Sequence, residues 1–300
     1  MPKIFLKMFK TIRYILNHPL SGKDPVKSVL RYFSWQLGYR INPYPILYPF
    51  IENSKLIVKK GMTGATGNIY VGLHDFEEMG FMLHLLRQDD LFADIGANIG
   101  SYTVLASNVA EAYTISFEPV PSTFKHLLDN IYINNIIHKV KCYNIGLGEK
   151  NSILKFSSSL DTVNHALTTE ERDSNYVEVQ IGILDDYCIE KTPLLLKMDV
   201  EGFEYNVLQG SKQTLKNPEL KAIIIELNQS SKRYGIEDET IHQFLISFGF
   251  KPYLYGPFKR LLKEMQIFRP NGNTIYLRDI DFIRKRIESQ RKIKVHSVEF

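Results

Sequence analysis

The chain has 300 residues and a mass of 34.8 kDa, which is enough for one large domain with extensions and too much for a small disulfide-stapled module. Its composition is 44% hydrophobic and 23% charged, and these ordinary globular values exclude wholesale disorder and collagen-like structure. The net charge of +4 is far below the balance of a dedicated nucleic-acid binder, so we expect no nucleic-acid partner. No apolar run approaches the roughly 20 residues that a membrane-spanning helix needs.

The two cysteines, Cys142 and Cys188, make neither a disulfide framework nor a four-cysteine zinc cluster. Their scarcity favours a reducing compartment, and we expect a cytoplasmic protein. Basic residues interrupt the apolar residues of positions 1–20, so we expect no cleaved signal peptide there. The same segment predicts a basic amphipathic helix that could contact a membrane surface peripherally. The alternative is that its basic residues are the solvent face of a helix packed on the domain.

Residues 1–68 are expected to form a helical and proline-rich extension. Apolar residues follow a helical spacing within positions 1–20, a second helix is predicted over residues 26–37, and prolines break the stretch at residues 43–49. At the other end of the chain, a basic helix and tail are expected over residues 281–300.

Between these ends, residues 69–280 alternate predicted strands with predicted helices. The strands are predicted at residues 91–94, 113–118, 140–143, 194–199 and 222–227 and near residues 253 and 275. The helices are predicted at residues 77–86, from residue 100 onward, and at residues 122–134, 204–214 and 239–248. This alternation predicts an α/β fold with a mostly parallel sheet and helices on both faces. It breaks at residues 152–187, where two strand-like segments, 153–156 and 177–183, flank a polar stretch and predict a hairpin-like insertion.

A glycine-containing turn, DIGANIG at residues 94–100, follows the first of these strands. Gly96 and Gly100 would let the backbone approach a ligand closely. A dinucleotide-binding turn has the spacing GxGxxG and cradles a pyrophosphate, whereas this turn has the spacing GxxxG and a carboxylate, Asp94, at the strand end. That carboxylate would repel phosphate and suit the ammonium group of S-adenosylmethionine. The alternative is an ordinary tight turn between a strand and a helix.

Two further positions at the same sheet edge are candidates for contact with a cofactor. Glu118 closes the next predicted strand, where a carboxylate can accept hydrogen bonds from both ribose hydroxyls. Alternatively, Glu118 merely precedes a turn at Pro119. Gly146 and Leu147 belong to a flexible loop after the third strand, and they are expected to flank the adenine.

Acidic residues gather after the fourth and fifth strands. Asp199 and Glu201 follow one strand, while Glu226 and Asn228 end the next. We expect Asp199, Glu226 and Asn228 to converge beside the cofactor as oxygen ligands suited to magnesium. Asp199 and Glu201 are also candidate catalytic groups. The alternative for Glu201 is that it stabilises the N-terminus of the following helix, as Glu204 would.

His165 lies within the polar part of the insertion. A histidine titrates near neutral pH and can act as a general base toward a hydroxyl, so His165 is a third candidate catalytic residue. Simple exposure on a loop is the alternative. His74 and Asp75, just ahead of the first core helix, form a second candidate pair.

These motifs together resemble the FkbM family of S-adenosylmethionine-dependent methyltransferases. The resemblance rests on three segments, namely FADIGANIGSYT at residues 92–103, FEP at 117–119 and LKMDVEGFE at 196–204. It implies that residues 69–280 are an FkbM-type domain with a Rossmann-like methyltransferase fold. By position, the methionine end of the cofactor would be held by Asp94, Gly96, Asn98 and Gly100, and the ribose by Glu118.

The resemblance also implies the acceptor class, which is a hydroxyl, commonly of a sugar in a glycan or glycolipid or of a polyketide. Methyl transfer to such a hydroxyl needs a base, such as His165 or an acidic residue, or a metal at Asp199 that lowers the hydroxyl pKa. Two rival functions stay open from the sequence: a nicotinamide-dependent oxidoreductase on the same sheet edge, and a membrane-surface binding module.

Overall fold

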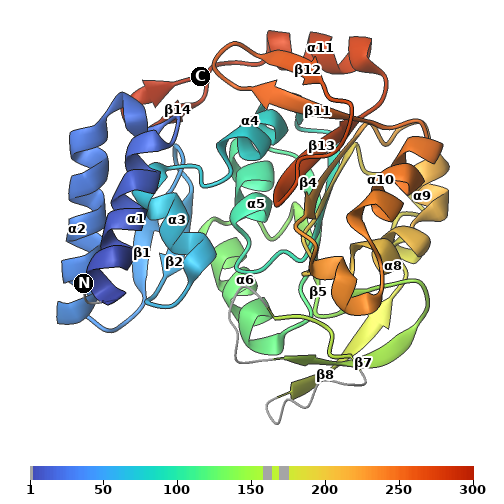
Figure 1. Ribbon diagram of the computed structural model, residues 1–300, viewed down its shortest axis with the longest axis horizontal. Coiled ribbons are helices and arrows are strands. Elements are labelled where there is room, and N and C mark those ends of the chain that lie inside the picture. The colour runs from blue at the N-terminus through green and yellow to red at the C-terminus, as the bar shows by residue number, and fades with distance from the viewer. Residues whose placement is uncertain (1–2, 158–163, 169–175) are drawn as a thin grey trace.

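The computed structural model describes residues 3–157, 164–168 and 176–300. Its central element is an eight-stranded sheet in which five adjacent strands are parallel and three antiparallel strands extend one edge (Figure 1). The strands follow the order β12 (Leu261–Glu264), β11 (Lys251–Gly256), β13 (Gly272–Leu277), β10 (Ala222–Leu227), β9 (Leu195–Met198), β3 (Leu91–Ile95), β4 (Tyr113–Phe117), β5 (Val140–Tyr143). The predicted mostly parallel sheet is therefore confirmed.

Helices cover both faces of this sheet, as predicted. One face carries α4 (Phe76–Leu85), α5 (Ser101–Val104) with the π-helical turn Leu105–Val109, α6 (Pro121–Ile133) and α11 (Ile280–Ser289). The other face carries α7 (Leu184–Tyr187), α8 (Glu204–Gln209), α9 (Lys212–Lys216) and α10 (Asp238–Ser247). Both faces of β3 are therefore buried. Phe92 packs against the α4, α5, α6 and α11 side of the sheet, and Ala93 and Ile95 pack against the α7 to α10 side.

The N-terminal extension is helical, as predicted, but it also contains a hairpin and a third helix. Its elements are α1 (Lys3–Asn17), the 3₁₀ turn Ser21–Lys23, α2 (Pro25–Ile41), β1 (Ile46–Pro49), β2 (Lys55–Val58) and α3 (Thr63–Val71). Trp35, Leu56 and Ile69 of this extension share one apolar core with the sheet and with Phe300. Residue 68 lies inside α3, and the division at residues 68 and 280 stays a prediction.

The insertion contains the two strands expected there. β7 (Ser152–Ser157) and β8 (Tyr176–Gly182) are antiparallel, and β6 (Gly146–Leu147) completes a small three-stranded sheet. The basic C-terminal helix, α11, ends at Ser289, and the tail that follows contains the hairpin β14 (Lys294–Val295) and β15 (Val298–Glu299). Within the described residues, no helix has the length and apolar character needed to cross a bilayer.

Candidate active site

A cavity of about 430 Å³ opens at the carboxyl ends of β3, β4, β9 and β10. Its lining includes Gly96, Glu118, Lys197, Asp199 and Glu226, which directly follow or end these strands. Ligands of open α/β sheets bind at this edge, where the direction of the strand order reverses on either side of β3. The topology therefore brings the separate sequence motifs to one site.

The glycine-containing turn at the end of β3 uses all its backbone N–H groups internally. The N–H groups of Gly96 and Ala97 both donate to the Phe117 carbonyl oxygen at 3.0 and 2.9 Å. The N–H groups of the next three residues donate to the Glu118 carboxylate, the Asn98 side-chain oxygen and the Ala97 carbonyl oxygen. The turn consequently has no free amide to offer to a pyrophosphate, whose binding depends on such groups.

Glu118 connects this turn to the end of β4. Its Oε2 accepts a hydrogen bond from the Asn98 N–H at 2.9 Å, and its Oε1 accepts one from the Val120 N–H at 3.0 Å. The side chain is only 6% exposed, and burial raises the pKa of its carboxyl group to about 7. Glu118 is thus held in one orientation at the cavity. Each of its carboxylate oxygens accepts one backbone hydrogen bond and can accept a second one from a ligand.

Lys197 was not assigned a role from the sequence, yet it is the cation of this site. It is 5% exposed, and its Nζ lies 2.9 Å from the Asp199 Oδ2 and 5.1 Å from the Tyr102 ring centroid. Burial alone would lower the pKa of its ammonium group, but the attraction of Asp199 and Asp94 outweighs burial and raises it. The period of two along a strand was the available signal, because it puts Lys197 and Asp199 on one face.

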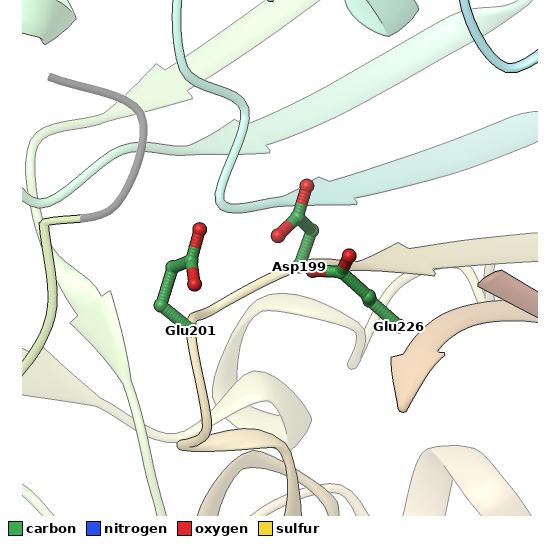
Figure 2. A group of neighbouring side chains, drawn as sticks. All are labelled: Asp199, Glu201 and Glu226. Carbon is green, nitrogen blue, oxygen red and sulfur yellow. The ribbon is translucent and has the colours of Figure 1, made fainter. Parts of the chain in front are cut away.

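Three carboxylates lie close together at this edge of the sheet, as Figure 2 shows. Asp199, Glu201 and Glu226 each offer an oxygen, and these oxygens lie within 4.8 Å of one another. Burial, and then repulsion by Asp199, raises the pKa of Glu201 to about 8 and that of Glu226 to about 7. The cluster therefore favours binding of a proton or another cation near neutral pH.

Residues from segments that precede β3 also line the cavity. Asn68, His74 and Asp75 line it together with Tyr102. The Tyr102 hydroxyl donates a hydrogen bond to the Asp75 Oδ2 at 3.1 Å, and the Tyr14 hydroxyl is hydrogen bonded to the His74 Nδ1 at 2.8 Å. The extension therefore contributes Asn68 to the site, whereas the sequence alone indicated only His74 and Asp75, which follow the extension.

Most of the residues predicted to hold the cofactor lie at the cavity. Its lining includes Gly96, Asn98, Glu118, Gly146 and Leu147. Among the described residues, Asp94 and Gly100 are not part of that lining. Asp94 is 1% exposed and accepts a hydrogen bond from the Thr103 hydroxyl at 2.6 Å, and burial raises its pKa. Gly100 has a φ of +88°, and a Cβ there would lie 2.5 Å from the Leu127 Cδ1 of α6, so this position favours glycine.

The predicted metal set of Asp199, Glu226 and Asn228 stays a prediction. Asp199 and Glu226 converge, and Glu201, which was not in that set, offers a third carboxylate oxygen beside them. Asn228 is not among the described lining residues, and its Oδ1 accepts a hydrogen bond from the Ser230 N–H at 2.9 Å. A hydrogen bond from Asn228 to Glu226 lowers the pKa of that carboxyl group, against the larger effect of burial.

His165 is buried, whereas simple exposure on a loop was the alternative to a catalytic role. It is 6% exposed, its N–H donates a hydrogen bond to the Ser157 Oγ, and its carbonyl oxygen accepts one from the Ser157 N–H. Within the described part of the chain, Asn164 rather than His165 lines the cavity. The catalytic roles given to His165, Asp199 and Glu201 stay predictions.

A mostly parallel sheet with an antiparallel extension and an acidic ligand cavity at its carboxyl edge defines the Rossmann-like methyltransferase fold, which confirms the expected fold class. The chain belongs to the FkbM methyltransferase family, because the family described as "Methyltransferase FkbM domain" matches residues 94–252. The family resemblance read from the three motifs is therefore confirmed.

Two curated relatives are similar to part of the chain. A hexuronic acid methyltransferase, AglP, from Haloferax volcanii is 29% identical, with 49% of this chain and 59% of that protein covered. Methyltransferase 1 from Beauveria bassiana is 28% identical, with 41% and 58% covered. The chain thus spans about three fifths of the length of these curated relatives. A crystal structure of an FkbM methyltransferase from Methylobacillus flagellatus aligns with a TM-score of 0.43 and 16% identity over 64% of this chain and 44% of that one.

Proposed function

We propose that the protein transfers a methyl group from S-adenosylmethionine to a hydroxyl of a sugar in a glycan or glycolipid. The observation that carries this proposal is the charge of the cavity. Its described lining contains five carboxylates, those of Asp75, Glu118, Asp199, Glu201 and Glu226, against the one ammonium of Lys197. Such a lining suits a cofactor that carries positive charge and no phosphate.

The residues fit the parts of this cofactor. We propose that the carboxylate of Glu118 accepts hydrogen bonds from the ribose hydroxyls, and that Gly146 and Leu147 flank the adenine. In this proposal Gly96 and Asn98 contact the methionine end of the cofactor. Asp94 and Gly100 do not contact it and instead stabilise the turn through their packing. When bound, S-adenosylmethionine supplies a methyl group on a positively charged sulfur. The chain's own residues then orient the acceptor, exclude water and accept its proton.

We propose Glu201 as the general base. Its pKa of about 8 is close to that which general-base catalysis near neutral pH requires. Asp199 is already paired with Lys197, so the ammonium group supplies part of the neutralisation that a divalent cation would give. A magnesium ion held by Asp199 and Glu226, and His165 as the base, are the two competing assignments.

The rival function as a nicotinamide-dependent oxidoreductase is disfavoured by the same turn. A dinucleotide needs free backbone amides for its pyrophosphate, and residues 96–100 donate theirs within the protein. The sugar acceptor is supported by the name of the relative AglP, a hexuronic acid methyltransferase.

Calorimetric titration with S-adenosylmethionine and with NAD tests the cofactor. We expect binding of the former only, weakened about tenfold or more by Glu118→Gln, since loss of one charge-assisted hydrogen bond costs about 1.5–3 kcal/mol. The matched variant Glu149→Gln, at an exposed position, leaves binding unchanged. Binding of NAD, or no binding of S-adenosylmethionine at millimolar concentration, would exclude the proposal.

Methyl-labelled cofactor and a panel of glycan extracts test the acceptor and the base. We expect label in a sugar, loss of turnover in Glu201→Gln with cofactor binding retained, and full turnover in EDTA. Loss of activity in EDTA with rescue by magnesium would favour the metal instead. Loss of turnover in His165→Ala but not in Glu201→Gln would make His165 the base.

A further inference from the structure

The outward face of α2 carries a row of large apolar side chains. Its members are Val26, Leu30, Phe33, Leu37 and Ile41, with exposures of 69, 58, 45, 59 and 77%. They are separated by four, three, four and four residues, so they lie on one face of the helix. The buried residues of α2, which are Ser28, Tyr32 and Trp35, lie on another face and pack on the protein. We call the five exposed residues the α2 stripe.

The neighbouring helix α1 has the same character. Phe5, Phe9 and Leu16 recur at helical spacing and are 56, 65 and 45% exposed, whereas Ile15 is fully buried. In Figure 1, α1 and α2 lie side by side at one end of the molecule, farther from the sheet than α4 to α6. Of the 23 exposed large apolar side chains among the described residues, 12 lie within positions 5–47. Apolar exposure is therefore concentrated on this pair of helices.

Positive charge is concentrated in the part of the chain that contains α1 and α2. Residues 1–51 contain eight Lys and Arg residues and one acidic residue, Asp24, which gives a net charge of +7. The other 249 residues contain 29 basic and 32 acidic residues and carry a net charge of −3. On α2 itself, Lys27 and Arg40 are exposed beside the stripe, and on α1 so are Lys7, Lys10 and Arg13.

We propose that the α2 stripe, with the basic residues around it, docks the protein on an anionic lipid bilayer. Exposed apolar side chains on amphipathic helices enter the headgroup region, and each nearby Lys or Arg adds about 1 kcal/mol, or about fivefold, to binding of an anionic surface. A second copy of the chain is the poorer occupant, because pairing the stripes would bring two segments of charge +7 together. The docking does not depend on the methyl transfer proposed above.

Vesicle flotation of the full chain tests the proposal. We expect flotation with vesicles of phosphatidylcholine and phosphatidylserine, weaker flotation with phosphatidylcholine alone, and release at high salt. Leu30→Glu with Leu37→Glu should weaken binding about tenfold or more, since two apolar contacts with the bilayer are lost. The control is Ile153→Glu with Ile189→Glu, which makes the same charge change at positions 65 and 81% exposed and should keep binding. If the wild type does not float, or both double variants bind equally, the proposal is wrong.

A fluorescence measurement needs no disruptive variant. Phe33→Trp places a tryptophan in the stripe, and Ile153→Trp places one away from it, while Trp35 contributes the same background to both. We expect brominated lipids to quench the first protein more than the second, whose quenching should not exceed that of the wild type with Trp35 alone. Size-exclusion chromatography tests whether a second copy of the chain occupies the α2 stripe instead. A wild-type dimer that Leu30→Glu with Leu37→Glu converts to a monomer, without quenching of Phe33→Trp by vesicles, would assign the stripe to a second copy and overturn the proposal.

Discussion

Lys197 shows how one residue balances the acidic edge of the sheet. Its position in β9 pairs with that of Asp94 in β3, and its ammonium group bonds the Asp199 carboxylate two residues later. Both partners therefore depend on a cation that is itself almost fully buried. Removal of one member of such a group leaves buried charge without compensation, which costs more than the intact group contributes.

We therefore expect Lys197→Met to reduce the free energy of unfolding by about 3 kcal/mol or more. Lys155→Met is the matched control, because Lys155 also lies over an aromatic ring, that of Tyr176 at 4.2 Å, but is exposed. An exposed cation–π contact contributes about 1 kcal/mol or less. Urea unfolding of both variants measures the difference, and equal losses would contradict the role given to Lys197.

Gly96 in the cofactor turn permits a second prediction. Its φ is +77°, and a Cβ would lie 1.9 Å from the Asp199 carbonyl oxygen. Gly235 has nearly the same φ, +74°, with no atom within 4 Å of its Cβ position. We expect Gly235→Ala to cost about 1–2 kcal/mol for the left-handed backbone alone. Gly96→Ala should cost a further 1–3 kcal/mol, roughly, because β9 must move. Equal thermal midpoints for Gly96→Ala and Gly235→Ala would show that the contact between the new Cβ and the Asp199 carbonyl oxygen is relieved at little cost.

Among the elements, the attachment of β2 to α6 determines how the extension meets the domain. The Asn130 Oδ1 accepts a hydrogen bond from the Ile57 N–H at 2.7 Å, and its Nδ2 donates to the Ile99 carbonyl oxygen at 2.8 Å. One helical turn later, the Asn134 side chain makes hydrogen bonds with both the N–H and the carbonyl oxygen of Lys55. Side chains of α6 thus satisfy the free edge of β2, and Asn130 also links that strand to the cofactor turn.

Asn130→Ala should lower the free energy of unfolding by about 2–3 kcal/mol, because it leaves the half-buried Ile57 N–H and the buried Ile99 carbonyl oxygen without partners. Asn134→Ala should cost about 1 kcal/mol or less, since water can reach the half-buried positions that it leaves. Chemical denaturation of the two variants measures both values. A larger loss for Asn134→Ala would contradict the assignment of the buried link to Asn130.

The helices and strands differ in how far their type could be predicted from the sequence. Strands such as β3 and β10 are continuous apolar runs buried on both faces, and the helices between them have a clear period, so their types were predictable. α3 has two glycines in nine residues and little helical propensity, and β1 includes Pro49, which only an edge position allows. Tertiary packing decides such elements. The predicted helix over residues 204–214 divides at Gly210, where a Cβ would lie 2.0 Å from the Gly148 carbonyl oxygen.

The candidate site was predictable to the extent that its residues end strands. Glu118, Asp199 and Glu226 share one edge because parallel strands bring their carboxyl ends together. Tyr102 and Asn68 reach the cavity from helices whose packing angles leave no local pattern in the sequence. The burial of His165 was not predictable for a related reason, because its polar neighbours do not reveal that its backbone groups bond Ser157 of β7.

For the whole molecule, the buried ionisable groups divide into two sets that act on stability in opposite directions. Burial lowers the pKa of His18, His84 and His296 from 6.5 to about 4. In the unfolded chain these histidines take up protons below pH 6.5, so their contribution to stability increases as pH rises from about 4 to 6.5. Burial raises the pKa of five glutamates from 4.5 to values of about 7 or 8. These are Glu78, Glu118, Glu201, Glu204 and Glu226.

Those glutamates hold protons in the native state that the unfolded chain has already released, so they destabilise the fold as pH rises from 4.5 to about 8. Because the histidine contribution is complete near pH 6.5, we expect the thermal midpoint to fall between pH 6.5 and 8. Glu201→Gln should reduce this slope by removing one titrating group, whereas Glu219→Gln, at an exposed position, should not.

A cationic ligand would favour the ionised glutamates of the cavity, so added S-adenosylmethionine should raise the midpoint more at pH 8 than at pH 6.5. Scanning calorimetry of the three proteins at both pH values measures these shifts, and a midpoint that rises from pH 6.5 to 8 without ligand would contradict the assignment of the glutamates.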